Sequence, residues 1–338
     1  PTMIVGGWWD QEDLFGPLAL YGALEKSDRE NHVSLVMGPW NHGGWNGSGT
    51  TLADVSFGSA TGKYFRENIQ APWFAYYLHD KGPLKHAEAT MFRSGSNEWK
   101  EYASWPPRKE ATPRNLYFRE GGKLSFEAPQ KKVAGDSNSY ISDPASPVPY
   151  RKRPIEGTYD PRGSRWRTWQ AQDQSFNNGR EDILSWSTDV LDADVTISGD
   201  VIANLFASTS GSDSDWVVKL IDVYPDKNDD PKLNGYQLMV AGEIFRGRYL
   251  SGFTVAKPIK PNAVNKYEFS IRGNDHTFLK GHKILVQVQS SWFPLYDRNP
   301  QTFVENIFLA KPSDYQKATQ SVYRTPQYPS NLAVMVAK

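Results

Sequence analysis

Two short segments of the chain end in side chains that could relay a proton. Residues 6–10 read Gly-Gly-Trp-Trp-Asp, and residues 38–42 read Gly-Pro-Trp-Asn-His. A carboxylate that accepts a hydrogen bond from one imidazole nitrogen fixes the tautomer of the ring, and the other nitrogen can then take a proton from a nucleophile. Asp10 and His42 therefore indicate the acid and the general base of a hydrolytic triad.

Both residues follow predicted strands that would bring them together. Residues 2–7 and 33–37 are short apolar runs typical of buried strands, and residues 14–26 between them carry apolar residues at helical spacing. In open α/β sheets, functional groups collect beyond the carboxyl ends of the strands. We therefore expect Asp10 and His42 to meet at one edge of a sheet.

The helices of this first part have recognisable local signals. Asp13 is expected to cap the helix over residues 14–26, and Pro17 fits its first turn. A second helix is predicted over residues 61–79, with a kink or a break at Pro72. The order strand, helix, strand, helix is typical of an α/β domain with a parallel sheet.

The pattern changes after about residue 86. The segments become short and alternating, with turn residues between them, which favours a β-sandwich or jelly roll. Residues 128–165 are rich in Pro, Ser, Asp and Arg and are interpreted as long loops. The predicted fold class is thus α/β plus all-β: residues 1–107 form the C-terminal part of an α/β-hydrolase domain, and residues 108–338 form a jelly-roll β-sandwich.

The nucleophile that such a pair requires is absent from this sequence. In α/β-hydrolases the triad follows the order Ser, Asp, His, and the serine stands in a Gly-x-Ser-x-Gly turn. Residues 58–62 have the two glycines, but Ala60 occupies the position of the nucleophile. We expect the serine upstream of residues 2–7. Taken singly, an aspartate after a strand is usually a cap or turn residue, and a histidine in a Gly/Trp loop is usually structural.

The amino-acid composition restricts the kinds of molecule that the protein is expected to bind. The formal net charge of the 338 residues is +0, which gives no electrostatic case for nucleic acid or an anionic membrane. The absence of cysteine excludes disulfides and thiolate nucleophiles within the chain. No apolar run approaches the ~18 residues that a membrane span needs. The 12 Trp residues favour either a sugar-, peptide- or aromatic-binding surface or aromatic packing in a β-rich core.

The motifs at Asp10 and His42 resemble those of the CocE/NonD and X-Pro dipeptidyl-peptidase group of serine hydrolases. Within that group, residues 208–225, 245–249 and 286–300 resemble the α-amino-acid ester hydrolases, a branch also labelled glutaryl-7-aminocephalosporanic acid acylases. The resemblance implies that Asp10 is the triad acid and His42 the general base. It also implies an α/β-hydrolase domain with an inserted helical cap, a C-terminal jelly roll, and no metal or organic cofactor.

Four tryptophans are candidates for contact with the substrate. Trp9 and Trp40 flank the predicted triad residues, so they are expected to wall the site or to belong to the core. In relatives the jelly roll contributes to the acyl pocket, which makes Trp166 and Trp169, in residues 164–174, further candidates. The alternative for this pair is aromatic packing between domains.

The other polar candidates are interpreted as structural. Glu12 and Asp13 are read as residues that complement the dipole of the following helix, and the carboxylates that bind a substrate ammonium are expected upstream. Residues 212–215, Ser-Asp-Ser-Asp, could bind calcium, but a turn is the expected role. The remaining histidines are interpreted as surface or packing residues: His32, His79, His86, His276 and His282.

These inferences predict a serine hydrolase that cleaves esters or amides of α-amino acids, including β-lactam acyl groups, through an acyl-enzyme. The alternatives are an X-Pro dipeptidyl-peptidase, a cocaine-esterase-like carboxylesterase, and a carbohydrate- or protein-binding β-sandwich. The expected partners are a small ester or amide, the missing N-terminal hydrolase segment and a second copy of the chain, but neither nucleic acid nor membrane. A bacterial protein of the periplasm or a secreted one is expected.

Overall fold

The first hundred residues build a small mixed sheet. In the computed structural model, which describes residues 1–83, 86–130 and 136–338, its strand order is β1 (Thr2–Gly7), β2 (Val33–Gly38), β5 (Ala89–Arg93) and β6 (Glu98–Tyr102). β1 and β5 both run parallel to β2, and β6 is antiparallel to β5. The two buried strands predicted from the sequence are confirmed. β5 and β6, the first short strands after about residue 86, where the pattern was expected to change, complete this first sheet.

Helix α1 (Gly16–Leu24) connects β1 to β2 and is shorter than the predicted residues 14–26. Pro17 lies in its first turn, as expected, because the missing N–H of proline has no partner to lose there. The predicted capping role of Asp13 is wrong. The helix begins after Phe15, and no side chain caps it.

The predicted second helix spans the expected residues without a break at Pro72. Helix α2 (Thr61–Phe65) passes through a π-helical turn, Arg66–Gln70, into α3 (Ala71–His79). Pro72 lies in the first turn of α3, where the hydrogen-bond pattern already changes. A short hairpin of β3 (Thr51–Leu52) and β4 (Val55–Ser56) precedes this helical stretch.

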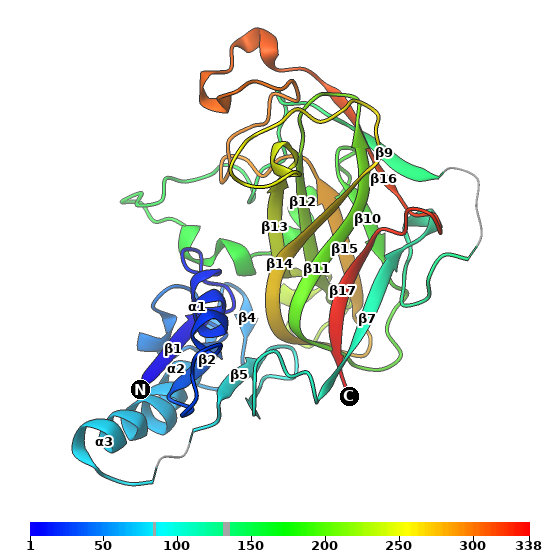
Figure 1. Cartoon of the computed structure of the whole chain (residues 1–338). Coiled ribbons are helices and arrows are strands. Elements are labelled where there is room, and N and C mark those ends of the chain that lie inside the picture. Colours follow the sequence, from blue (N-terminus) through cyan, green and yellow to red (C-terminus); the bar gives the residue numbers. More distant parts are fainter. Residues whose placement is uncertain (84–85, 131–135) are drawn as a thin grey trace.

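The remainder of the chain forms two antiparallel sheets packed face to face (Figure 1). Their facing apolar side chains, among them Trp186, Val218, Leu205 and Tyr267, form one buried core, which confirms the predicted β-sandwich. The four-stranded sheet has the order β10 (Leu184–Ser187), β15 (Lys283–Gln289), β12 (Asp215–Val223), β13 (Gln237–Arg246). The other sheet comprises β8 (Leu124–Ser125), β7 (Ala111–Phe118), β17 (Asn331–Ala337), β11 (Val195–Thr209), β16 (Ala318–Tyr323), β9 (Ser137–Ser142) and, paired with β11, β14 (Asn265–Phe278).

Strand β9 lies inside residues 128–165, which were expected to contain only loops. It pairs with β16, some 180 residues later in the chain, so its neighbour could not be read from the local composition. Part of this stretch, residues 131–135, lies outside the described residues. The division of the chain at residue 107 stays a prediction.

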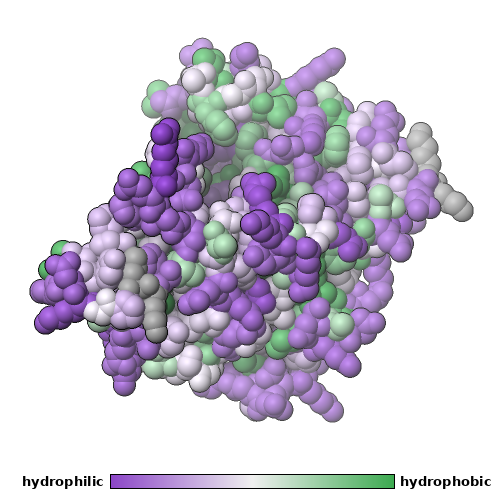
Figure 2. Space-filling model, turned by 60° about the horizontal axis from the view of Figure 1, so that its bottom comes forward, coloured by the Kyte–Doolittle hydropathy of each residue, from purple (hydrophilic) through white to green (hydrophobic). Residues whose placement is uncertain are grey.

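Figure 2 shows one face on which hydrophilic side chains predominate, with hydrophobic residues scattered among them. None of the helices in the described ranges is both long and apolar enough to cross a lipid bilayer.

Candidate active site

Asp10 lies in the turn that follows β1, and its carboxylate is held on both oxygens. Oδ1 accepts hydrogen bonds from the backbone N–H groups of Glu12 at 2.8 Å and Asp13 at 2.9 Å. Oδ2 faces the His42 ring, and the residue is 1% exposed. Hydrogen bonds from backbone N–H groups hold a carboxylate in a fixed orientation. The turn therefore presents a fixed, buried acceptor.

His42 follows β2 and meets this acceptor. Its Nδ1 lies 3.0 Å from Asp10 Oδ2, and its backbone N–H donates to Gln11 Oε1 at 3.1 Å. The side chain keeps 38% of its surface exposed. With Nδ1 engaged by the carboxylate, Nε2 is the ring nitrogen left to exchange a proton with a nucleophile. The two residues are brought together as expected, and their catalytic role stays a prediction.

The approach of the two strand ends depends on Gly7. The backbone N–H groups of Trp8 and Trp9 donate to the carbonyls of Gly38 at 2.9 Å and Trp40 at 3.1 Å. A Cβ atom at residue 7 would lie 2.2 Å from the carbonyl oxygen of Trp40. Only glycine permits this contact, so the Gly-Gly pair in the motif has a direct structural purpose.

The acidic surroundings of His42 favour its charged form. Partial burial of the ring opposes ionisation, but the hydrogen bond and the charge of Asp10, aided by the charges of Glu12 and Asp13, outweigh it and raise the pKa of His42. Asp13 Oδ2 lies 3.4 Å from His42 Nδ1. Asp13 thus places a second, exposed carboxylate beside the imidazole of His42 and does not cap the helix.

Among the described residues, the side chains of Asp10, Asp13 and His42 come nearest to a metal-binding arrangement. One ligand atom each from Asp10, Asp13 and His42 lies within 4.8 Å of the others. Both Asp10 oxygens are already engaged by N–H groups, so we assign no metal here. The calcium interpretation of residues 212–215 also loses support, because the Asp213 carboxylate is bound by the guanidinium of Arg248 at 2.7 Å.

Trp9 and Trp40 are buried in the core of this chain. Each is 1% exposed. The Trp9 indole N–H donates to the carbonyl of Met239 on β13 at 2.8 Å, and that of Trp40 donates to Thr61 Oγ1 at 2.9 Å. Their packing gives no support to the prediction that they line a substrate site.

Trp166 and Trp169 lie in a short 3-10 helix, Trp166–Ala171, beside the site. Trp169 is buried against Tyr150 and Trp292, whereas Trp166 is partly exposed. The residue of this helix that reaches the turn bearing Asp10 is Gln170, whose Nε2 donates to the carbonyl oxygen of Asp10 at 2.7 Å. Gln170 was not predicted from the sequence, because no local pattern links residues that are 160 positions apart.

The sandwich anchors the segment that carries Gln170. The Tyr236 hydroxyl donates to the carbonyl of Ala171 at 2.6 Å, and the backbone N–H of Gln237 donates to Asp173 Oδ1 at 3.0 Å. Further along, Lys219 Nζ donates to Gln174 Oε1 at 3.1 Å. Lys219 is fully buried on β12, and burial lowers its pKa to about 7. These contacts connect the sandwich to the turn that bears Asp10.

A second buried network joins the small sheet to the sandwich. Asp222 accepts hydrogen bonds from His276 Nε2 at 3.0 Å and His282 Nδ1 at 2.8 Å. His276 Nδ1 lies 2.7 Å from Ser94 Oγ, just beyond β5. Both rings are buried and hydrogen-bonded, so of the two expected roles, surface or packing, His276 and His282 have the packing role. The network is nearly inaccessible to solvent and lies apart from Asp10 and His42.

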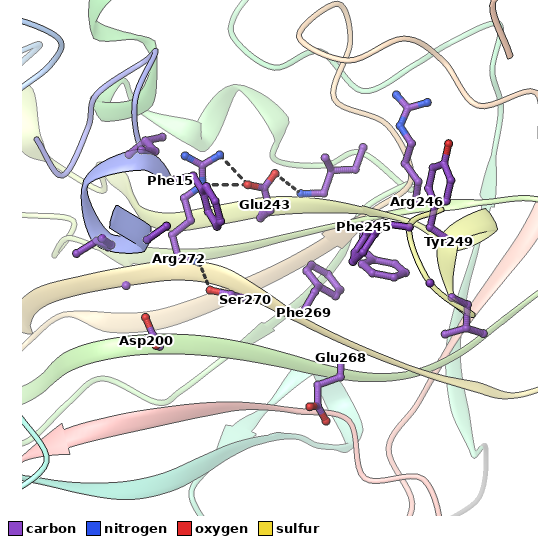
Figure 3. A pocket seen from close by; sticks show the side chains of 18 residues that line it. Phe15, Asp200, Glu243, Phe245, Arg246, Tyr249, Glu268, Phe269, Ser270 and Arg272 are labelled. Carbon is purple, nitrogen blue, oxygen red and sulfur yellow. Dashed lines mark hydrogen bonds and ion pairs between the residues drawn. The ribbon is translucent and has the colours of Figure 1, made fainter. Parts of the chain in front are cut away.

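A cavity of about 860 Å³ opens between the start of α1 and strands β13 and β14. Figure 3 shows the Glu243–Arg272 ion pair and the rings of Phe245 and Phe269 along its wall. Neither Asp10 nor His42 lines it, nor does any of the four candidate tryptophans. The cavity is therefore separate from the contact between Asp10 and His42.

Comparison with known proteins relates the chain to a family of hydrolases. Residues 80–333 match the family described as the X-Pro dipeptidyl-peptidase C-terminal non-catalytic domain. The cocaine esterase of Rhodococcus sp. (strain MB1 Bresler) is 30% identical over 352 residues, which cover 100% of this chain and 56% of that protein.

Two solved structures are more similar still. An aminopeptidase from a marine sediment Thaumarchaeota archaeon superposes with a TM-score of 0.97 and 47% identity, covering 100% of this chain and 55% of the other. An α-amino-acid ester hydrolase superposes with a TM-score of 0.93 and 45% identity, covering 99% and 55%. The chain thus spans about half the length of the relatives it matches.

Proposed function

Because the chain belongs to the CocE/NonD and X-Pro dipeptidyl-peptidase group of hydrolases, as a C-terminal portion, we propose that it supplies the acid and the general base of a serine hydrolase. The observation that carries the proposal is the 3.0 Å contact between Asp10 Oδ2 and His42 Nδ1 at the ends of two parallel strands. The nucleophilic serine lies outside residues 1–338. In this view β1, β2 and β5 are the last parallel strands of an α/β-hydrolase domain, and the sandwich is a jelly roll.

The proposed reaction proceeds in two balanced steps. In the first step the serine oxygen bonds to the substrate carbonyl carbon, and His42 Nε2 takes the proton of the serine hydroxyl. The same proton then passes to the leaving alcohol or amine as its bond to the carbonyl carbon breaks. Water then gives a proton to Nε2, attacks the acyl-enzyme and releases the acid as the serine regains its proton. Asp10 keeps Nδ1 protonated and stabilises the imidazolium formed in each step.

The proposed substrates are esters and amides of α-amino acids. The similarity to an α-amino-acid ester hydrolase and to an aminopeptidase supports this class, because both relatives are named for derivatives of amino acids. The resemblance of residues 208–225 to the acylase branch extends the proposal to β-lactam amides. The high identity to the aminopeptidase favours a second candidate, removal of N-terminal residues from peptides.

Hydrolysis assays on the complete protein test the proposal. We expect turnover of an aminoacyl ester, and loss of several orders of magnitude in kcat for His42→Ala with the fold retained. His32→Ala is the matched control, because His32 is exposed on the loop before β2 and should leave turnover unchanged. Anilides of a single amino acid and of an X-Pro dipeptide separate the ester hydrolase, the aminopeptidase and the dipeptidyl-peptidase.

The chain alone gives a further test. Purified residues 1–338 should not hydrolyse an aminoacyl ester, because the nucleophile is supplied from elsewhere. Robust turnover by the isolated chain would place the nucleophile within it and refute the proposal. Full activity of His42→Ala in the complete protein would favour a binding role for this part of the molecule instead.

A further inference from the structure

The turn that carries Asp10 is held by the sandwich at two consecutive residues. The Trp9 indole N–H donates to the carbonyl of Met239, and the carbonyl of Asp10 accepts a hydrogen bond from Gln170 Nε2. Gln170 is 5% exposed and Asp10 1%, so this bond is shielded from solvent. Both partners from the sandwich belong to residues 80–333, the part matched by a family described as non-catalytic.

The Gln170 amide has little freedom to leave this position. Its neighbour Ala171 is fixed by the Tyr236 hydroxyl, and Gln174 by Lys219. Lys219 lies on β12, and Tyr236 directly precedes β13, the neighbouring strand of the four-stranded sheet. These contacts fix the short helix in place. The Gln170 amide on this helix therefore reaches the main chain of Asp10, the residue that faces His42.

We propose that Gln170 is a positioning residue, which keeps the Asp10 carboxylate in register with His42 by holding the peptide unit of Asp10. The inference rests on the proposed function, since it concerns the same proton relay. The Gln170 amide bonds the main chain of Asp10, and it acts through that main chain.

The physical argument is the cost of an unpaired buried carbonyl. Without the Gln170 donor, the oxygen of Asp10 would lose its bond in a shielded place, and the turn would rotate that peptide toward water. Rotation of the peptide moves the attached carboxylate away from Nδ1. Misplacement of a catalytic group by about 1 Å can lower the rate about 100-fold.

Gln170→Met tests the inference, because it keeps a side chain of similar length without the donor. Gln172→Met is the matched control, since the Gln172 amide bonds to Arg165 and Thr168 of its own segment and, among the described residues, not to the turn that bears Asp10. In ¹³C-histidine-labelled chain, NMR titration follows the pKa of His42 without any need for activity. We expect Gln170→Met to lower this pKa toward its ordinary value, and Gln172→Met to leave it unchanged.

In the complete protein, Gln170→Met should lower kcat about 10- to 100-fold with KM nearly unchanged. An unchanged pKa of His42 in Gln170→Met would overturn the inference whatever the activity. A lowered pKa in a protein without any hydrolase activity would retain the positioning role and refute only the proposed function. Should Gln170→Met fail to fold, Gln170→Asn keeps an amide one methylene shorter, and it should lower the pKa by a smaller amount; no change would again overturn the inference.

Discussion

Replacement of Lys219 by methionine should make the protein more stable at neutral pH and remove part of its dependence on pH. Lys219 is fully buried, and its ammonium lies 3.1 Å from Gln174 Oε1 and 5.2 Å from the centre of the Trp292 ring. Burial lowers its pKa from about 10.5 to about 7, because few groups replace the water that a cation loses.

The size of the effect follows from the two pKa values. One pKa unit corresponds to about 1.36 kcal/mol, so the buried amine costs about 5 kcal/mol of folding free energy well below pH 7. Between pH 7 and about 10.5 the unfolded chain binds more protons than the folded one, so stability rises with pH. From pH 7 to pH 9.5 this group alone contributes a gain of about 3 kcal/mol.

Urea unfolding at pH 7 and pH 9.5 measures this gain. We expect Lys219→Met to lack it, and to be more stable than the parent at pH 7 by about 1–3 kcal/mol, since the lost bond to Gln174 offsets part of the relief. Lys63→Met controls for removal of one positive charge, because Lys63 is exposed on α2. Identical pH dependence in the parent and in Lys219→Met would refute the reasoning.

Three further substitutions test other contacts. Asp13→Asn should lower the pKa of His42 by removing its second carboxylate; an NMR titration that shows a rise would contradict this. Asp222→Asn should reduce the free energy of unfolding by about 3–5 kcal/mol at pH 7, and less below pH 4, because burial raises the pKa of Asp222 but hydrogen bonds from two histidines outweigh it and hold that pKa low; urea unfolding at both pH values checks this. Arg248→Met should cost a similar amount by leaving the buried Asp213 carboxylate without its cation, and the double variant with Asp213→Leu should recover most of it; no recovery would show that the ion pair is not the cause.

Local sequence patterns were sufficient to predict the two strands and the helix that bring Asp10 and His42 together. The strands before Asp10 and His42 are short apolar runs, and the connecting helix has its proline where a first turn accepts one. Parallel pairing of two such strands brings their carboxyl ends to the same edge. The position of both side chains therefore followed from local sequence and one general rule of α/β sheets.

Contacts between distant parts of the chain were not predictable in this way. Gln170 reaches Asp10 across 160 positions, and Ser94 reaches His276 across 182. Neither residue differs in its local sequence from an ordinary polar residue of a turn or strand. The role of Asp13 was misjudged for a related reason, since the start of α1 three residues later frees its carboxylate for the imidazole.

The tryptophans beside Asp10 and His42 show a different limit of prediction from sequence. Trp9 precedes Asp10 directly, yet its ring turns away to stack on Phe57 and to bond the sandwich. Both residues lie in the turn after β1, and Asp10 faces His42 while Trp9 packs against the sandwich, so adjacency in sequence does not place two side chains in the same surroundings. Trp40 is likewise packed between Phe65 and Trp99.

The tight fit at Gly7 bears on how related sequences are judged. A methyl group there would force the two strand ends apart by contact with the Trp40 carbonyl, while Asp10 and His42 themselves stayed unaltered. Such a protein would keep every reacting group and still lose the contact between them. A homologue that retains the aspartate and the histidine should therefore be credited with a working pair only if a glycine also stands three residues before the aspartate.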